Sequence, residues 1–589
     1  MLKFENKTVV ITGSGTGIGQ AIAKKFAENG ANIIILGRRK KPLEDTEIIL
    51  KEIFLKINSN AFVKSFASTD VSDEISITNL FANLKKSNIN VDILINNAGV
   101  SGPVTCFANS PLEEFKKAID IHLTGTFWTS VKAIENMKPG SKIITISTFF
   151  TEERPLEQRP YRFRSPYTAA QGAKNRLVEC MSWELVNKKI ISIGTNPGPV
   201  HSDRIYKTVY PKAASEFLRV SGFKELSPQE VENINQDLLE VLGEDENTVN
   251  KKITEINTKF NTAQSNPDFE NTIRKLYQKI KTIAEKIQLN TSKMIVDGQF
   301  LSQSQVAESI MNLCDDEISK ILNGKIIPGD RVFYPVKPHI TTDIQKIQQP
   351  YFNSNVFILT IDANDDPSYY KAEEIATHIE KNGGKVICFL SKNITNELYG
   401  NLNNKFHVHQ IDLSNTDEVD KWTNTTKSKF GKLYMFIHIT GNINDKDLID
   451  MTRSEWNESI NRFIVVPSII TKNALSHFVP NGAKDPREFK NKSGMVIIIG
   501  PDSIIGKKIP GSKRAKVEVF RGLLRPFTTT VNQELNDVLK SKIRVQLMLS
   551  GSLDGKEPNI KRLLHAINYF ANYIPKSSEV IYQLDDLRT

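Results

Sequence analysis

The chain has 589 residues and a formal net charge of +10 at pH 7. This length exceeds one ordinary hydrophobic core and suggests about two to four domains. Lys and Asn are spread along the whole sequence without a basic block rich in aromatic residues, so the charge favours a solvated surface over a nucleic-acid site, although a basic field still favours anionic substrates.

Four cysteines lie far apart and form no CxxC pair, which argues against a disulfide framework and against a zinc site. No run of about 18 apolar residues could form a membrane span. A strand pattern begins within the first few residues, where a signal peptide would need its apolar core. We therefore expect a soluble cytoplasmic protein with no metal site, no membrane contact and no nucleic-acid partner.

A glycine loop, TGSGTGIG at residues 12–19, follows a strand-like run at 8–11 and leads into a helical pattern at 20–28. A strand, a glycine loop and a helix in this order hold a dinucleotide pyrophosphate at the positive end of the helix dipole. The first glycine permits the tight turn, the second lets backbone NH groups approach the phosphates, and the third lets the helix pack close to the strand. The loop residues that we expect at the cofactor are Gly13, Ser14, Gly17, Ile18 and Gly19.

Short apolar runs rich in β-branched residues alternate with helical patterns in the first third of the chain. The runs lie at residues 8–11, 32–36, 61–65, 93–95, 142–146 and 190–194. Strands that alternate with helices imply βαβ units and a parallel sheet covered by helices on both faces. We therefore predict an α/β fold with a Rossmann-type, doubly wound parallel sheet.

Four motifs in a fixed order resemble the short-chain dehydrogenase/reductase family. They are TGSGTGIG at 12–19, DV at 70–71, NNAG at 96–99 and NPGP at 196–199. The resemblance covers residues 5–204 and resumes near 300–335. It implies a sheet that binds NAD(P) along its carboxyl edge, with further contacts from Asp70, Val71, Asn97, Ala98, Gly99, Pro197 and Gly198.

The residues after the second strand indicate which nicotinamide cofactor is bound. The run LGRRK at 36–40 has no acid where the ribose 2′-hydroxyl of NAD would need an acceptor. Guanidinium groups suit a 2′-phosphate because they form bidentate, charge-assisted contacts. Arg38 and Arg39 therefore favour NADP(H), unless both side chains only face solvent.

The family resemblance also implies a catalytic tyrosine, a serine or threonine that orients the substrate oxygen, a lysine four residues after the tyrosine, and an asparagine in a proton relay. Tyr167 opens a helix similar to the catalytic helix of the family, and Thr148 stands at the serine position with Ser147 beside it. Gln171 occupies the lysine position and has no charge to lower the pKa of a phenol. His122 stands where the family has asparagine.

Two side chains could cover for the missing groups. Lys174 lies on the same broad helix face as Gln171, only about 4.5 Å further along the axis, and His122 could take part in the relay. Tyr161 is a rival proton donor because it has the family's usual spacing from the threonine, but Ser165 follows it at the lysine position. These departures leave two interpretations, which are a working reductase with a modified relay and a cofactor-binding domain with weak or no turnover.

Residues 205–299 interrupt the pattern where an ordinary family member would reach its last strand. They are typical of three or four polar helices, with helix starts near Ser227 and Asn266 and a break at 290–292. We interpret them as an inserted helical subdomain over the substrate opening, or as an oligomer contact.

The sheet pattern resumes after this insert. A helix is predicted at 304–314, a strand at 325–328 and an edge segment at 332–334. Residues 1–204 and 300–340 are therefore expected to form one NADP-binding short-chain dehydrogenase domain.

Residues 350–589 repeat the order of the first part, with HITG at 438–441 in the place of NNAG. The loop after the first strand of this repeat, residues 362–367, has no glycine and carries three carboxylates where phosphates would lie, which disfavours phosphate binding. No Tyr occurs between residues 503 and 539. We therefore predict a second tandem sheet in a degenerate short-chain dehydrogenase-like domain that does no catalysis.

An intact copy, a helical insert and a degenerate copy together resemble the tandem form of the family in the amino-terminal part of bifunctional malonyl-CoA reductases. The resemblance implies NADPH-dependent reduction of malonate semialdehyde to 3-hydroxypropionate, with Tyr167 as proton donor and a separate CoA reductase polypeptide supplying the aldehyde. The alternatives are a weak or inactive NADP-binding subunit that docks such a reductase, and a general 3-oxoacyl or alcohol reductase. We also expect a homodimer.

Overall fold

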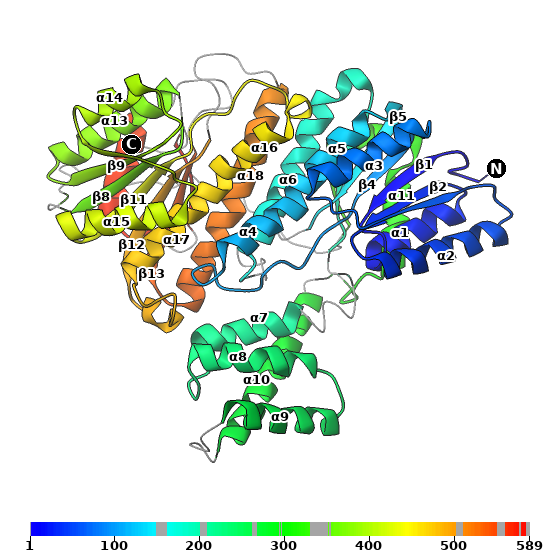
Figure 1. Ribbon diagram of the computed structural model, residues 1–589, viewed down its shortest axis with the longest axis horizontal. Coiled ribbons are helices and arrows are strands. Elements are labelled where there is room, and N and C mark those ends of the chain that lie inside the picture. The colour runs from blue at the N-terminus through cyan, green and yellow to red at the C-terminus, as the bar shows by residue number, and fades with distance from the viewer. Residues whose placement is uncertain are drawn as a thin grey trace.

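The computed structural model describes residues 2–148, 162–198, 200, 209–261, 268–293, 295, 297–329, 352, 355–363, 365–501, 511–549, 560–575 and 579–584. Two seven-stranded sheets lie side by side, and a group of helices projects away from them (Figure 1). This confirms the predicted fold class, two tandem Rossmann-type doubly wound parallel sheets with an inserted helical subdomain.

The first sheet has the strand order β3-β2-β1-β4-β5-β6-β7, and every pair is parallel. Its strands are β1 (Thr8–Thr12), β2 (Asn32–Gly37), β3 (Val63–Ala67), β4 (Val91–Asn96), β5 (Met137–Ile146), β6 (Ile191–Asn196) and β7 (Ile326–Pro328). Each predicted run overlaps a strand, although β3 begins later and β5 begins earlier than predicted. The strand order reverses between β1 and β4, which is where such sheets open a crevice at their carboxyl ends.

Alternate residues of the central strands supply two separate cores, one on each face of the first sheet. Val9 and Ile11 of β1 pack with one layer of helices, whereas Val10 between them packs with the other. The first layer contains α1 (Gly17–Glu28), α2 (Lys40–Lys56) and α11 (Gln303–Leu313). The second contains α3 (Glu74–Lys86), α4 (Leu112–Ile119), α5 (Gly125–Ile134) and α6 (Ser165–Glu184).

The second sheet repeats this topology with the order β10-β9-β8-β11-β12-β13-β14. Its strands are β8 (Val356–Ile361), β9 (Lys385–Ser391), β10 (His407–Ile411), β11 (Leu433–Ile439), β12 (Ser493–Ile499), β13 (Lys542–Leu549) and β14 (Ile581–Gln583). The helices named below are α13 (Asp366–Lys381), α14 (Asn396–Asn403), α16 (Arg453–Ile460), α17 (Val466–Phe478) and α18 (Gly511–Gln533). We call the parts built on the two sheets the first and second copies.

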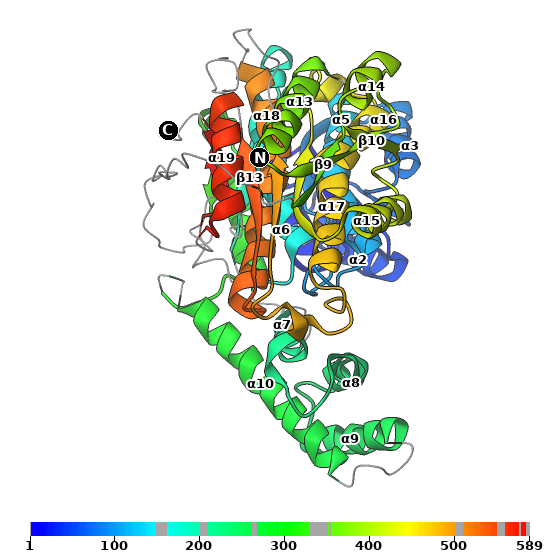
Figure 2. The ribbon, with the colours of Figure 1, turned by 90° about the vertical axis from the view of Figure 1, so that its left-hand side faces the viewer.

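The insert consists of α7 (Tyr210–Phe217), α8 (Pro228–Glu240), α9 (Glu246–Phe260) and α10 (Phe269–Ser292), which enclose an apolar core of their own. Ser227 forms a capping box with Glu230 at the start of α8, as the sequence predicts for a helix start. The predicted break at 290–292 is the last turn of α10. Figure 2 shows α9 and the far end of α10 projecting well away from both sheets.

Helices α6 and α18 pack side by side and join the two copies (Figures 1 and 2). They cross at two glycines, because a Cβ on Gly172 would lie 2.5 Å from the Gly522 carbonyl oxygen. A Cβ on Gly522 would in turn lie 3.1 Å from the Gly172 carbonyl oxygen. Beside this crossing, the ring of Trp456 in α16 stacks on Phe127 of α5 with centroids 3.8 Å apart.

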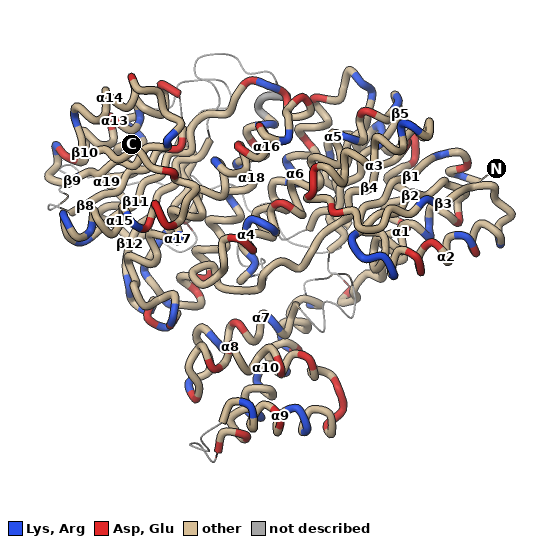
Figure 3. Tube along the Cα trace, in the orientation of Figure 1, with Lys and Arg blue, Asp and Glu red and all other residues tan. Residues whose placement is uncertain are grey.

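Charged residues are distributed over both copies and the insert, with acidic and basic side chains interspersed (Figure 3). This pattern agrees with a solvated surface. Within the part of the chain that the structure describes, no helix has the length and apolar character needed to cross a bilayer.

Candidate active site

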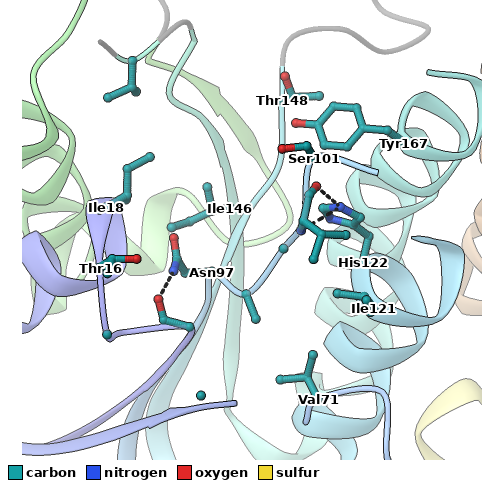
Figure 4. Close-up of a pocket in the computed structure, with 18 of the residues that line it drawn as sticks. Thr16, Ile18, Val71, Asn97, Ser101, Ile121, His122, Ile146, Thr148 and Tyr167 are labelled. Atoms are coloured by element: carbon teal, nitrogen blue, oxygen red, sulfur yellow. Dashed lines mark hydrogen bonds between the residues drawn. The ribbon is translucent and has the colours of Figure 1, made fainter. Parts of the chain in front are cut away.

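A cavity of about 580 Å³ lies at the carboxyl ends of β1, β4 and β5 in the first copy (Figure 4). The loop between β1 and α1, the segment after β4 and the start of α6 all contribute to its walls. The residues predicted from the sequence that line it are Gly13, Gly17, Ile18, Arg38, Arg39, Asp70, Val71, Asn97, Ala98, Gly99, His122, Ser147, Thr148, Tyr167, Gln171, Lys174, Pro197 and Gly198. The fold therefore brings the expected cofactor residues and the expected catalytic residues to one place.

Two predicted residues, Ser14 and Gly19, lie behind the glycine loop and do not line the cavity. The Ser14 hydroxyl donates to the carbonyl of Ile11 and accepts from the NH of Leu36, both at 3.0 Å, so it ties the loop to β2. A Cβ on Gly19 would lie 2.4 Å from the Gly13 carbonyl oxygen. Gly19 therefore allows α1 to approach the loop closely.

The glycine loop has the backbone that a pyrophosphate requires. Gly13 has a φ of +65° and Gly17 a φ of +64°, which favour glycine over any residue with a side chain. A Cβ on Gly17 would meet nothing within 4 Å, so the backbone at the start of α1 is open to the cavity. Asn97 Nδ2 donates to the Thr12 carbonyl at 2.9 Å and fixes the segment after β4 against the loop. These are the features that favour an anion at a helix N-terminus.

The two arginines after β2 reach the same cavity. Arg38 Nη1 lies 3.7 Å from Asp70 Oδ2, and Arg39 Nη2 donates to Thr16 Oγ1 at 3.4 Å. The Arg38 side chain is 52% exposed, so its guanidinium remains accessible to a ligand. The cavity therefore has positive charge beside the glycine loop.

Tyr167 lies in the first turn of α6 in contact with two cationic or ionisable side chains. The His122 ring meets it edge-on, with ring centroids 5.1 Å apart and planes at 88°. Arg164 Cζ lies 3.8 Å from the centroid of the phenol ring. Arg164 Nε and Nη2 both donate to the Ser101 carbonyl, at 3.1 and 2.7 Å, which holds the guanidinium in this position.

Arg164 is not predicted from the sequence, because the family pattern places the cation four residues after the tyrosine and not before it. The signal was its place three residues before Tyr167, a spacing at which side chains meet on a helix surface. Arg164 is buried and lines the cavity. The site thus contains a cation against the phenol even though position 171 has none.

His122 and Gln171 form a pair. His122 lies in a π-helical turn, Asp120–Thr124, a rare geometry that often marks functional sites. Its Nε2 lies 2.8 Å from the Val100 carbonyl and its Nδ1 lies 3.2 Å from Gln171 Nε2. The Val100 NH also lies 3.3 Å from Nε2. If Nδ1 accepts from Gln171, a neutral ring has its proton on Nε2 and donates it to the Val100 carbonyl, so Nε2 does not accept from the Val100 NH. Gln171 Oε1 is buried without a partner among the described residues, and a sugar hydroxyl would satisfy it.

The two hydroxyl candidates at the end of β5 have different surroundings. Ser147 Oγ donates to the main-chain carbonyl of Gln171 at 3.2 Å, so it is used within the protein. Thr148 lies next to the Tyr167 ring in Figure 4 and lines the cavity. This placement favours Thr148 over Ser147 as the residue that orients a substrate oxygen.

Lys174 is fully buried beneath the cavity. Its Nζ donates to the Ile146 carbonyl at 2.6 Å. Burial lowers the pKa of Lys174 from an ordinary 10.5 to about 7, because the charged ammonium loses its hydration. Near neutral pH, Lys174 can therefore be either protonated or neutral, whereas a lysine with its ordinary pKa stays protonated.

We expect the buried Lys174 to make stability depend on pH. Between about pH 7 and pH 10.5 the unfolded chain binds this proton more tightly than the folded chain, so the free energy of unfolding should rise as the pH rises through that window. Lys174→Met removes the effect. As the pH rises from about 7 to 10, the Tm of the wild type should therefore increase relative to the Tm of Lys174→Met. Parallel curves of Tm against pH would contradict the lowered pKa.

In the second copy, the loop after β8 is held by contacts of its own side chains with α13 and with the segment after β11. Asp365 Oδ1 accepts from the NH of Ser368 at 2.9 Å at the start of α13, where phosphates lie in a cofactor site. Asp365 Oδ2 accepts from the NH of Asn442 at 3.2 Å. A Cβ on Gly441 would lie 2.5 Å from Ala363 Cβ, so the two loops are in close contact.

Some sequence predictions lie outside the described residues, namely those for Tyr161 and for the edge segment at 332–334. Of the residues that the structure does describe, no group of three or more His, Cys, Asp or Glu side chains could hold a metal ion.

The sequence profile described as short chain dehydrogenase matches residues 7–210 and 372–515. An oxidoreductase of Thermotoga maritima whose function is uncharacterised is 33% identical over 197 residues, which are 33% of this chain and 72% of that protein. The 3alpha-hydroxysteroid dehydrogenase of Mediterraneibacter gnavus is 30% identical over 206 residues, 35% of this chain and 78% of that enzyme. Each of these matches covers about a third of this chain, 33% and 35%.

Two solved structures are similar over the whole chain. The N-domain of a bacterial malonyl-CoA reductase, determined with NADP, has a TM-score of 0.69 and 14% identity, and the match covers 99% of each chain. The C-domain of a bacterial malonyl-CoA reductase, also with NADP, has a TM-score of 0.71 and 15% identity over 98% of each chain. At this identity the likeness establishes the tandem fold. Together with the profile matches in both copies, it shows that this chain belongs to the short chain dehydrogenase family.

Proposed function

We propose that this oxidoreductase reduces malonate semialdehyde to 3-hydroxypropionate with NADPH, using Tyr167 as the proton donor. One observation carries the proposal: Tyr167, an open glycine loop and two arginines suited to a 2′-phosphate line one cavity. The likeness in fold to the N-domain of malonyl-CoA reductase with NADP supports this choice of substrate and cofactor. The net charge of +10 suits an aldehyde that carries a carboxylate.

The residues of the cavity fit a nicotinamide dinucleotide. Gly13 and Gly17 leave backbone NH groups open to the pyrophosphate, and the guanidinium groups of Arg38 and Arg39 suit a 2′-phosphate. The buried Gln171 Oε1 has no partner among the described residues and would accept a hydrogen bond from a ribose hydroxyl. When bound, the reduced nicotinamide supplies the hydride that adds to the aldehyde carbon.

The chain itself supplies the proton. Tyr167 donates its phenol proton to the aldehyde oxygen, while Thr148 beside it holds that oxygen with a hydrogen bond. The guanidinium of Arg164 lies 3.8 Å from the centre of the ring and so places a cation beside the proton donor. We assign the return of a proton to His122 and Lys174, whose side chains line the same cavity.

Replacing both Arg38 and Arg39 with Ala is expected to raise the Kd for NADPH at least about tenfold, because a hydrogen bond to a charged group is worth about 1.5–3 kcal/mol. The Kd for NADH should stay within about twofold, because NADH has no 2′-phosphate for the arginines to contact. Fluorescence titration of the purified protein with each cofactor measures both constants. An unchanged ratio of the two constants would mean that the arginines only face solvent.

The decisive assay follows NADPH consumption with a panel of short aldehydes and keto acids. Turnover of malonate semialdehyde well above that of acetaldehyde and propionaldehyde would support the proposed substrate. Greater activity on longer 3-oxoacyl compounds would favour a general 3-oxoacyl or alcohol reductase instead.

A second candidate function is that of a weak or inactive NADP-binding subunit that docks a separate CoA reductase. It is favoured by one observation, the presence of Gln171 at the position where the family resemblance implies a lysine. It predicts tight NADPH binding without turnover of any aldehyde in the panel. It also predicts that a CoA reductase polypeptide purifies together with this chain.

The proposal also covers the domain bounds, the cellular location and the oligomeric state. We divide the chain into an NADP-binding domain at 1–204 and 300–340, the helical insert at 205–299, and a degenerate domain at 350–589. The carboxylate of Asp365 at the start of α13 supports the absence of a cofactor from the second copy. A cytoplasmic location and a homodimer complete the proposal, and sedimentation analysis of the purified protein tests the oligomeric state.

A further inference from the structure

A buried carboxylate of the second copy reaches into the first copy close to Tyr167. Glu534 follows the end of α18 and is 1% exposed. Its Oε1 accepts from the NH of Phe163 and its Oε2 accepts from the NH of Phe107, both at 2.7 Å. A single side chain therefore holds two backbone segments of the other copy, the one before α6 and the one after β4.

Phe163 has an unusual backbone conformation that requires such support. Its φ is +67°, a left-handed value that is uncommon for residues other than glycine. Its NH is bound by Glu534, and its carbonyl accepts from the NH of Thr105 at 2.9 Å. Backbone strain of this kind persists only where surrounding contacts hold it, and here one of the contacts comes from Glu534, directly after α18.

The strained residue directly precedes the arginine that contacts the proposed proton donor. Arg164 follows Phe163, lies with its Cζ 3.8 Å from the Tyr167 ring centroid and is bonded to the Ser101 carbonyl. A change in the Phe163 backbone would turn the base of the Arg164 side chain. The position of the guanidinium on the phenol thus depends on the turn that Glu534 holds.

We propose that Glu534 of the second copy is a positioning residue for the Tyr167 site of the first copy, acting through the backbone of Phe163 and the side chain of Arg164. The inference rests on the proposed function only in assigning the proton to Tyr167. It gives the degenerate copy a role in catalysis, because without the second copy the turn before α6 would lose the side chain that binds the Phe163 NH.

Other charged groups around Glu534 also hold the segments that flank the site. Burial raises the pKa of Glu534, and the nearby Glu216 acts in the same direction, whereas the NH groups of Phe107 and Phe163 favour the carboxylate. Glu216 of the insert accepts from the NH of Cys106 at 2.7 Å and is paired with Arg219 at 2.6 Å. Arg162 Nη2 lies 3.3 Å from Asp537 Oδ2. The segments on both sides of the site are therefore held by carboxylates from other parts of the chain.

The chain offers a matched control in Glu184. Glu184 and Glu534 occupy matching positions in the two copies. Each lies the same number of residues after the glycine of its own crossing helix, Gly172 in α6 and Gly522 in α18. Glu184 Oε1 accepts from the NH of Leu448 and Oε2 from the NH of Ile449, both at 3.0 Å. It therefore makes the same kind of contact in the opposite direction, toward the copy without a proposed site.

The test compares full-length Glu534→Gln and Glu184→Gln with the wild type. Gln keeps the size of Glu but has one acceptor oxygen in place of two. We expect Glu534→Gln to lower kcat for aldehyde reduction about tenfold or more, with the KM for NADPH nearly unchanged. Glu184→Gln should keep kcat within about twofold, although both variants lose a similar contact between the copies.

Amide hydrogen exchange supplies a readout that does not require turnover. In Glu534→Gln we expect exchange at residues 101–107 and 162–167 to be about fivefold faster, as the loss of one hydrogen bond implies. Glu184→Gln should leave these segments unchanged and speed exchange near residue 448. Equal exchange at 162–167 in Glu534→Gln and the wild type would overturn the inference. So would an equal loss of kcat in both variants, whereas a wild type without turnover would contradict the proposed function alone.

Discussion

Tyr167→Phe is expected to lower kcat for NADPH-dependent aldehyde reduction about 10³-fold, within the range that loss of a general acid produces. Phe keeps the ring that packs against His122 and Arg164, so the cavity should keep its shape. Only the proton that reaches the substrate oxygen is removed. The Kd for NADPH, measured by fluorescence titration, should therefore remain near the wild-type value.

Tyr161→Phe is the matched control for this experiment. Tyr161 has the family's usual spacing from Thr148 and is the rival proton donor that the sequence suggests. We expect its loss to leave kcat within about threefold, because no family-like helix follows it in the sequence. If Tyr161→Phe were inactive and Tyr167→Phe active, the proton donor would have to be reassigned.

Gly172→Leu is expected to separate the two copies or to prevent folding. Even a Cβ at this position would lie 2.5 Å from the Gly522 carbonyl oxygen and 2.7 Å from Pro526 Cγ, and the first of these atoms belongs to the backbone of α18. Overpacking of a core costs about 1–3 kcal/mol when side chains can move aside, and more when backbone must move. We expect the free energy of unfolding to fall by more than about 3 kcal/mol, measured by chemical denaturation.

Gly400→Ala is the matched control for the helix crossing. Gly400 lies in α14, and a Cβ there would meet nothing within 4 Å. Ala in a helix is favoured over Gly by about 1 kcal/mol, so this variant should be as stable as the wild type or slightly more stable. Any folded Gly172→Leu protein should also lose activity, because shifting α18 moves Glu534 away from Phe163. A Gly172→Leu protein with wild-type stability would mean that the helices do not cross at these glycines.

Most of the fold could be predicted because local patterns determine it. The β-branched runs such as Ile33–Leu36 are buried on both faces, and a strand of that kind is readable from composition alone. Strand ends were less accurate, as in β3, because the boundary depends on pairing with β2 and not on the local residues. The start of α8 was predictable from Ser227 because a capping box is local chemistry.

The site was predictable where a motif corresponds to a backbone requirement. Gly13 and Gly17 were found because their positive φ values exclude most other residues. Ser14 was expected at the cofactor but is turned toward Leu36, and the direction of a serine side chain cannot be read from a motif. The pairing of His122 with Gln171 was also unpredictable, because it joins two helices far apart in sequence.

The contacts between the two copies could not be inferred from the sequence. Gly172 and Gly522 look like ordinary helix glycines until the two helices are seen to cross. Glu534 is a charged residue near a helix end, where exposure is the usual expectation. Its burial depends on two backbone NH groups that come from segments hundreds of residues earlier.

The packing of α6 against α18 brings the apolar residues of the two sheets into contact. One continuous apolar cluster contains Val10 and Leu94 of the first sheet together with Ile358 and Phe436 of the second. The two sheets should therefore denature in a single cooperative transition, and neither half should be stable when expressed alone. The insert, whose apolar cluster is separate, is free to melt at its own temperature and to give calorimetry a second peak.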